Sequence, residues 1–149
     1  MEELLKHNLE SLFYNALTAN ELAFADNTVK NIMQSDQLNL LKNEEITALL
    51  YKWNALSEIR QTRINKLVDW VNDKFVPYLL PKMSFKEMDA LINFKWSGTS
   101  KVKPDYYPLF QDVEFENYLD NSLWLQQQIL ERCENTRTLI DEMISATKP

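Results

Sequence analysis

The sequence predicts an all-α protein, and three observations support that fold class. Apolar residues recur at intervals of three and four along most of the chain, which places them on one face of a helix. The 149 residues include a single glycine, so the tight turns that need this residue are few. Prolines and short polar clusters separate the periodic stretches. We therefore expect one domain over residues 1–149, a bundle of three long helices (2–25, 44–75 and 113–145) with two short helices (29–34 and 85–94).

The most extended pattern is that of the central helix, residues 44–75. Asn43 suits the N-cap position because its side-chain oxygen can accept from the free backbone N–H groups of the first turn. Glu44 and Glu45 follow, where negative charge suits the positive end of the helix dipole. Pro77 has no backbone N–H and is expected to end the helix near Phe75. The apolar face comprises Ile46, Leu49, Leu50, Trp53, Leu56, Ile64, Leu67, Val68, Val71 and Phe75.

Polar residues mark the ends of the other helices. Residues 26–28, Asp-Asn-Thr, predict a break and a new N-cap between the first long helix and the first short one. Ser84 and Glu87 fit a capping box at the start of the second short helix. Residues 120–122, Asp-Asn-Ser, compete locally with the backbone of the last helix and can bend it. Because long helices joined by short links usually run antiparallel, we expect the first, central and last helices to form the core.

Composition excludes several classes of function. The net charge is −6 and the pI about 4.8, so a general affinity for nucleic acid or for anionic lipid is not expected. No run approaches the roughly 20 apolar residues of a membrane helix, and the N-terminus does not resemble a signal peptide. There is no glycine-rich phosphate loop, serine nucleophile elbow or CxxC pair. We therefore expect no cofactor and no catalytic residue.

Two single residues could carry chemistry but have simpler interpretations. His7 is the only histidine, and Glu3 and Glu10 lie one turn away on each side, so a surface metal site is conceivable. A solvated helix face is the favoured interpretation, and without any Glu-x-x-His motif the chain cannot build a di-iron site of the bundle type. Cys133 is the only cysteine and lies beside the apolar positions of the last helix. We interpret it as a small buried residue rather than a nucleophile.

An acidic cluster gathers at the start of the last helix: Asp112, Glu114, Glu116 and Asp120. Paired carboxylates can hold a cation or perform acid–base chemistry, so a metal-binding or enzymatic use of residues 112–116 is one hypothesis. The favoured interpretation is structural, because acidic residues stabilise the first turn of a helix.

The candidate interaction surface combines a basic patch with the aromatic residues of the one long loop, residues 95–111. The patch on the central helix comprises Arg60, Arg63 and Lys66, and the loop aromatics are Trp96, Tyr106 and Tyr107. The patch could receive an anionic ligand or partner, but pairing with acidic residues of neighbouring helices is the favoured interpretation. Amphipathic rings are enriched in ligand clefts and protein interfaces, although a lid over one end of the bundle explains them as well.

Several passages together resemble a large uncharacterised family of Bacteroidota whose members carry an N-terminal membrane helix and a helical domain. They are Ser-Asp-Gln-Leu-Asn-Leu-Leu-Lys-Asn-Glu-Glu-Ile at 35–46, Leu-Tyr-Lys-Trp at 50–53, Val-Pro-Tyr-Leu at 76–79 and Phe-Gln-Asp-Val-Glu-Phe-Glu-Asn-Tyr-Leu at 110–119. Their order and spacing extend the likeness over about residues 28–145. The family has no assigned activity. The resemblance implies a membrane-tethered protein with this domain outside the cytoplasm, although this chain lacks the membrane helix.

These observations predict a non-enzymatic interaction or sensor domain, the soluble part of a membrane-anchored protein. Its partner would be an unknown protein or a second copy, and membrane contact would run only through a segment absent from this chain. Two alternatives stay open at this point. One is a metal-binding protein or enzyme that uses the acidic cluster, and the other is a purely structural dimerisation domain.

Overall fold

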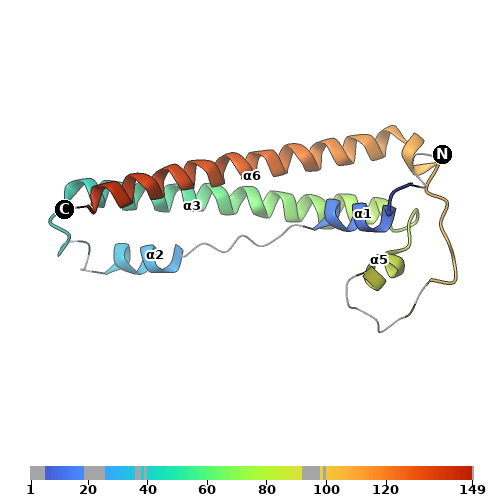
Figure 1. Ribbon diagram of the computed structural model, residues 1–149, viewed down its shortest axis with the longest axis horizontal. Helices are drawn as coiled ribbons and strands as arrows, with labels where there is room; N and C mark the ends of the chain where they lie inside the picture. The colour runs from blue at the N-terminus through green and yellow to red at the C-terminus, as the bar shows by residue number, and fades with distance from the viewer. Residues whose placement is uncertain are drawn as a thin grey trace. The chain divides into compact units, whose positions relative to one another are not determined.

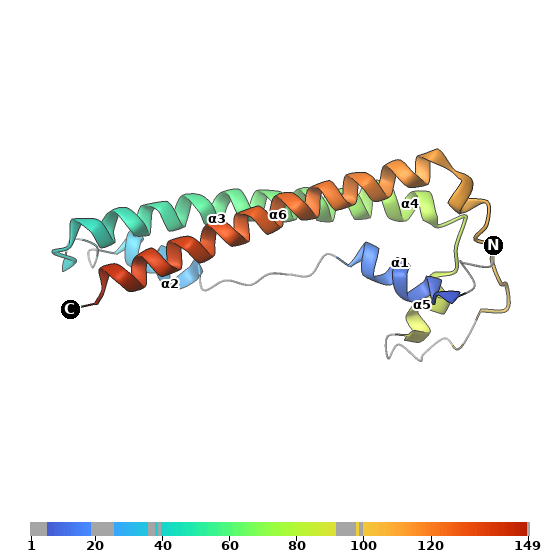
Figure 2. The same ribbon diagram turned by 45° about the horizontal axis from the view of Figure 1, so that its top comes forward.

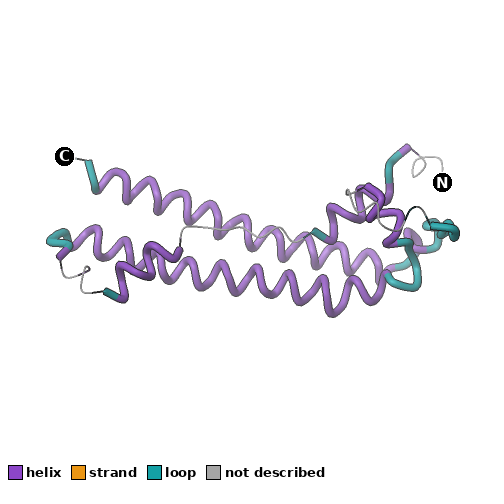
Figure 3. The backbone as a smooth tube through the Cα atoms, turned by 90° about the horizontal axis from the view of Figure 1, so that it is seen from below, coloured by secondary structure: helices purple, strands orange, loops and turns teal. Residues whose placement is uncertain are grey.

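The all-α prediction is confirmed by a computed structural model that describes residues 6–18, 26–35, 38, 40–91, 98 and 100–148. The described residues form helices and loops without a strand (Figures 1 and 3). The α-helices are α1 (Leu9–Leu17), α2 (Asp26–Gln34), α3 (Glu44–Trp70), α4 (Val76–Leu79), α5 (Phe85–Leu91) and α6 (Val113–Ala146). A π-helical turn, η3 (Val71–Phe75), joins α3 to α4, and a 3-10 turn, η5 (Leu109–Gln111), precedes α6.

The chain divides into two compact units. Unit 1 comprises Met1–Asn20 and Leu67–Trp124, and unit 2 comprises Glu21–Lys66 and Leu125–Pro149. Helix α3 continues from unit 2 into unit 1, and α6 returns from unit 1 into unit 2. Within each unit, the segments of α3 and α6 lie side by side (Figures 1 and 2). That the whole chain forms one domain stays a prediction.

Unit 1 is built around an aromatic core. Helices α3, η3 and α4 form one continuous helix, and its C-terminal part packs antiparallel on the start of α6. Trp70 Nε1 donates to Ser122 Oγ at 3.1 Å, and the ring centroids of Phe75 and Phe115 are 6.2 Å apart. The residues buried in this core are Phe13, Phe75, Leu79, Met83, Met88, Leu109 and Phe115. Phe13 belongs to α1, which packs on α5, so the first helix contributes to this core as expected.

Unit 2 combines α2 with the first part of α3 and the second part of α6. Lys52 of α3 lies 3.6 Å from Glu142 of α6, and Arg60 donates to Thr136, so these segments run antiparallel. Leu49, Trp53 and Leu139 form the buried cluster, and Val29 of α2 packs against it. Figure 3 shows α2 beside α3 within this unit. No α2 residue is fully buried, so this helix covers the cluster from its edge.

The central helix begins as predicted but ends later. Asn43 Oδ1 accepts from the backbone N–H groups of Glu45 and Ile46 at 3.0 and 3.2 Å, which confirms the N-cap. The prediction that Pro77 ends the helix near Phe75 is wrong, because α4 continues to Leu79. The π-helical turn lets the N–H of Val76 reach the carbonyl of Val71, five residues back. The hydrogen-bonding register thus shifts just before Pro77. The helix can therefore continue through this residue, which has no backbone N–H.

The first helix is much shorter than the predicted range 2–25. Asn8 caps its start, since Asn8 Oδ1 accepts from the backbone N–H of Ser11 at 2.9 Å. Thr18 has an extended backbone and donates from both its N–H and its hydroxyl to the carbonyl of Tyr14, which ends the helix. The remaining positions 2–5 and 19–25 lie outside the described residues.

Of the two short helices, α2 ends at Gln34 as predicted but begins earlier than predicted. The break predicted at residues 26–28 is wrong, because α2 already begins at Asp26, whose carboxylate is held by α3. Helix α5 begins at Phe85 as expected, but the Glu87 carboxylate accepts from the backbone N–H of Ser100 instead of turning back to the cap. The predicted residues 92–94 of that helix lie outside the described part. In the described ranges, no helix has the length and apolar character required to cross a membrane.

Candidate functional site

The two described aromatic residues of the predicted loop surface differ in role. Tyr106 is half-buried, its ring centroid lies 5.4 Å from that of Phe13, and its hydroxyl donates to Glu10 Oε1 at 3.2 Å. Burial, followed by the nearby Glu10 carboxylate, raises the pKa of Tyr106 to about 12. Tyr106 therefore fastens the loop to α1. Tyr107 is 40% exposed, so it is available for contact, and Trp96 lies outside the described residues.

A groove of about 560 Å³ lies in unit 1, between the corner after α4 and the segment before α6. Its walls carry three prolines and the buried side chains of Met83 and Leu109, together with a few polar groups. This combination of an apolar lining with a few fixed polar groups is typical of binding sites. The lining residues are Pro81, Lys82, Met83, Ser84, Ser100, Val102, Pro104, Asp105, Pro108, Leu109 and Asp112.

Two polar residues of the groove lining, Lys82 and Asp112, meet a third polar side chain, Tyr78. Tyr78 donates its hydroxyl hydrogen to Asp112 Oδ2 at 2.6 Å, and Lys82 Nζ lies 2.7 Å from the same oxygen. The Lys82 ammonium also lies 3.5 Å from the centre of the Tyr78 ring, a cation–π contact. The other oxygen of Asp112 accepts from the backbone N–H of Glu114 at 2.9 Å and so caps α6. Hydrogen bonds from Lys82, Tyr78 and that N–H lower the pKa of Asp112 to about 2.

The predicted acidic cluster therefore does not converge on a common point. Asp112 is held by Lys82 and Tyr78, whereas Glu114, Glu116 and Asp120 are exposed on the surface of α6. Across the ranges that the structure describes, no three His, Cys, Asp or Glu side chains gather as metal ligands. His7 is exposed as expected, but it lies before α1 and not on a helix face. The metal-binding or enzymatic alternative stays a hypothesis.

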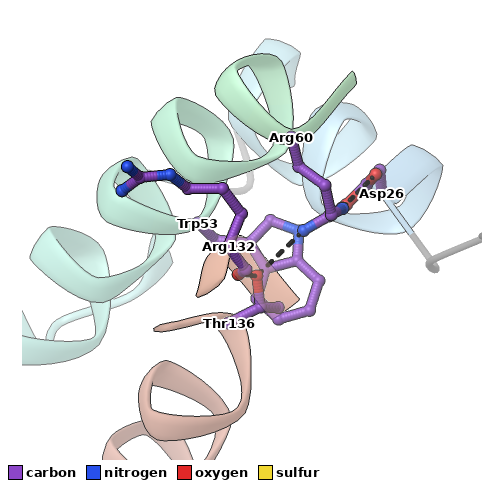
Figure 4. A network of polar contacts seen from close by, with 5 residues as sticks. All are labelled: Asp26, Trp53, Arg60, Arg132 and Thr136. Atoms are coloured by element: carbon purple, nitrogen blue, oxygen red, sulfur yellow. Dashed lines mark hydrogen bonds and ion pairs between the residues drawn. The ribbon is translucent and has the colours of Figure 1, made fainter. Parts of the chain in front are cut away.

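The basic patch predicted on the central helix divides into two parts. Arg60 is only 2% exposed and belongs to the interior of unit 2. Its Nη2 donates to both carboxylate oxygens of Asp26 at 3.1 and 2.8 Å, and its Nη1 donates to Thr136 Oγ1 at 3.0 Å. Figure 4 shows this arrangement between α2, α3 and α6. Arg60 therefore pairs with an acidic residue of a neighbouring helix, as the structural interpretation predicts. Because it is buried, it is not part of an interaction surface.

Asp26 is the common acceptor of this buried network. Trp53 Nε1 donates to Asp26 Oδ1 at 2.9 Å, and Thr136 donates its own hydroxyl hydrogen to the carbonyl of Arg132 at 2.8 Å. Burial raises the pKa of Asp26, but hydrogen bonds from Ser57 and Arg60 outweigh it, and the net pKa is lowered. The charged groups are thus mutually satisfied, and the network holds α2 onto the rest of unit 2.

The other patch residues face outward. Arg63 is half-buried, Lys66 is exposed, and both line a shallow hollow of about 370 Å³ together with Glu58, Ile59 and Thr62. This hollow lies on one face of α3 in unit 2, whereas the loop aromatics belong to unit 1. Cys133 of α6 is a half-buried free thiol, less covered than the sequence predicts.

Sequence reasoning missed the groove and the Tyr78–Lys82–Asp112 cluster. Pro81, Pro104 and Pro108 were visible as breaks, but nothing in their spacing indicates that they line a common surface. Searches with this chain among protein-family models, curated proteins and solved structures found no match.

Proposed function

We propose that this chain is a non-enzymatic interaction domain that binds a partner through the groove of unit 1 and the loop beside it. The observation that carries the proposal is the groove itself, with Val102 on its wall left 73% exposed and Tyr107 exposed between two lining residues, Asp105 and Pro108. Apolar side chains that solvent reaches beside a preformed concavity are typical of interaction sites.

The loop that forms this surface is fastened at several points. Tyr106 bonds to Glu10, and the N–H of Ser100 bonds to the Glu87 carboxylate. The Ser100 hydroxyl donates to the carbonyl of Val102 at 2.8 Å. A surface held in place before binding loses less conformational entropy when it captures a partner. These contacts support a recognition role for the exposed residues between them.

The polar groups of the groove favour binding over catalysis. Lys82 and Asp112 neutralise each other, and Asp112 is occupied as the cap of α6. A general base or nucleophile would need a partner poised to exchange a proton with substrate. In this cluster the hydrogen bonds instead stabilise the charged forms, since the pKa of Lys82 is raised and that of Asp112 is lowered.

Site-specific photocrosslinking in the natural host tests this function. A photoreactive phenylalanine analogue replaces Tyr107 in one variant and Tyr51 in another. Both tyrosines are exposed, at 40% and 55%, but Tyr51 lies on α3 in unit 2 and serves as the matched control. We expect a discrete adduct with another protein from position 107 and none of the same mass from position 51. No adduct at 107, or identical adducts at both positions, would contradict the proposal.

For location, we propose that the domain acts outside the cytoplasm as part of a membrane-tethered protein. The support is the resemblance of residues 28–145 to membrane-anchored Bacteroidota proteins. Fractionation of the natural host, followed by the intact mass of the native protein, tests this. Recovery with the membranes at a mass above 17.6 kDa is the expected result. A native protein of that mass in the soluble fraction would contradict it.

A further inference from the structure

Helix α6 carries a second apolar stripe that unit 2 does not bury. Leu130, Ile140 and Ile144 are exposed by 52%, 36% and 51%. Together with Cys133 and Arg137 they occupy successive positions at intervals of three, four, three and four. This alternation is the spacing of a heptad seam, on which a neighbouring helix can lie along several turns.

The face of α6 that packs inside the unit is a different one. Ile129 and Leu139 are buried there at 8% and 3% exposure, and Thr136 is fully covered and accepts from Arg60. Thus α6 has one apolar face already occupied within unit 2 and a neighbouring stripe in contact with solvent. An isolated exposed leucine is ordinary, but three exposed aliphatic residues on one stripe, with Cys133 and Arg137 between them, can receive a helix over about four turns.

The charges beside the stripe indicate what kind of helix fits. Glu134 and Asp141 each follow a seam position directly, at Cys133 and Ile140, and both are exposed. In a heptad these are flanking positions, whose charges select the partner. Arg137 is exposed and lies in the seam itself, where it adds a positive charge. An occupant with lysine or arginine along its flank, and an acidic group opposite Arg137, would match this pattern.

A second copy of the chain matches it poorly. In a parallel pairing of two stripes, each Arg137 would meet its own counterpart, because equivalent seam positions face each other. In an antiparallel pairing, the acidic flank with Glu134 and Asp141 would face the same acidic flank of the other copy. Like charges set opposite each other oppose association.

We propose that this stripe of α6, Leu130 to Ile144, docks an amphipathic helix of another protein with an apolar seam and basic flanks. This inference goes beyond the function proposed for the unit 1 groove, since it concerns a separate surface in unit 2. Both surfaces would belong to an interaction domain, but neither requires the other.

Two designed peptides test the proposal on the full chain. Both have leucine at the seam positions of three heptads, and they differ only in carrying lysine or glutamate at the flanking positions. Fluorescence anisotropy of the labelled peptides measures binding. The lysine peptide is expected to bind, more weakly as salt rises from about 0.05 to 0.5 M, and the glutamate peptide is expected not to bind. Equal binding of the two peptides, or no binding of either, would overturn the proposal.

Variants assign the binding to the stripe. Leu130→Lys combined with Ile144→Lys is expected to weaken the lysine peptide at least about tenfold, because two apolar contacts become repulsive. Tyr51→Lys, at an equally exposed apolar position on α3, is the control and should bind as the parent does. Circular dichroism confirms that each variant stays helical. Unchanged binding of the lysine peptide by the double variant would overturn the assignment. Light scattering that shows a dimer for the parent and a monomer for the double variant would also overturn it. Crosslinking from Tyr107 is unaffected either way, so the two proposals can fail separately.

Discussion

Each unit contains a lysine or arginine paired with an aspartate, and the two pairs differ mainly in burial. The Lys82–Asp112 and Arg60–Asp26 distances are almost equal, at 2.7 and 2.8 Å. The side chains of the first pair are 33% and 31% exposed, whereas those of the second are 3% and 21% exposed. An exposed pair is weakened by water and salt, but a buried charge that loses its partner is strongly destabilising. Nearly equal geometry therefore implies unequal contributions to stability.

This difference also separates structure from function. The Asp26–Arg60 network connects three helices and leaves no exposed group of Arg60 for a partner. The Tyr78–Lys82–Asp112 cluster lies at the wall of an open groove and holds the first turn of α6. We expect changes in the first to affect folding and changes around the second to affect recognition. Four variants or conditions test this contrast, in order of decreasing expected effect.

Asp26→Ala should have the largest effect. It removes the carboxylate that accepts two hydrogen bonds from the buried Arg60 guanidinium, and we expect the free energy of unfolding to fall by about 3 kcal/mol. Urea denaturation followed by circular dichroism measures the change. Replacing Arg60 as well, in an Asp26→Ala/Arg60→Met double variant, should recover part of the loss because the uncompensated charge is removed. A loss below about 1 kcal/mol in the single variant would mean that water reaches Arg60 freely.

Thr136→Val tests the second contact of the same arginine. Valine has nearly the shape of threonine but cannot accept the hydrogen bond that Arg60 Nη1 donates to Thr136 Oγ1. We expect a loss of about 1–2 kcal/mol in the same denaturation experiment. Thr138→Val provides the control, because Thr138 is exposed and its hydroxyl bonds only within α6. Equal losses in both variants would assign the effect to helix propensity and not to Arg60.

Acid should release the cap of α6 in unit 1. The pKa of Asp112 in the folded protein is about 2, below its ordinary value of 3.8, so the folded state favours the charged carboxylate. Its stabilising contribution is therefore complete above about pH 4 and is lost as the pH falls through about 2. Thermal melts of the parent and Asp112→Asn should differ at neutral pH and converge in acid. A constant difference across that range would show that the charge of Asp112 does not contribute.

Lys82→Met should have the smallest effect on stability. It removes the exposed ion pair with Asp112 but retains an unbranched side chain that can cover the Tyr78 ring. Thermal melts at low salt should show a slight decrease that disappears at about 1 M NaCl, where exposed charges are screened. A loss comparable to that of Asp26→Ala would contradict the proposed difference between the two pairs.

The fold class and the starts of α3 and α6 could be predicted, because they depend on local signals. Asn43 and Asp112 stand at the starts of α3 and α6. The three- and four-residue periodicity identified the buried face of α3 but not that of α6, where Leu130, Ile140 and Ile144 follow the same spacing and are exposed. The end of α1 could not be predicted, because it depends on which group the Thr18 side chain bonds. The continuation of the central helix through Pro77 could not be predicted either, because no residue pattern in the sequence indicates the shift to π-helical hydrogen bonding.

The site residues show the same limit. Arg60 interrupts the apolar stripe of the central helix seven residues after Trp53 and four before Ile64, so its position on the buried face was visible in the sequence. Its acidic partner was not, because Asp26 comes from a helix that the sequence placed three residues later. Tyr106 and Tyr107 are adjacent, yet one packs on Phe13 and the other faces solvent. Only the tertiary path of the loop distinguishes them.

The most direct test of the central claim compares partner capture with stability in the same set of variants. The partner identified by crosslinking at position 107 is co-purified with the parent, with Val102→Asp/Tyr107→Ala and with Thr136→Val, and is quantified by mass spectrometry. Val102→Asp/Tyr107→Ala is expected to lose the partner while keeping the Tm of the parent, because both side chains are exposed. Thr136→Val is expected to keep the partner at a lower Tm. Partner recovery that follows Tm across the set, or a Val102→Asp/Tyr107→Ala variant that binds fully, would contradict the claim that the unit 1 surface performs the recognition.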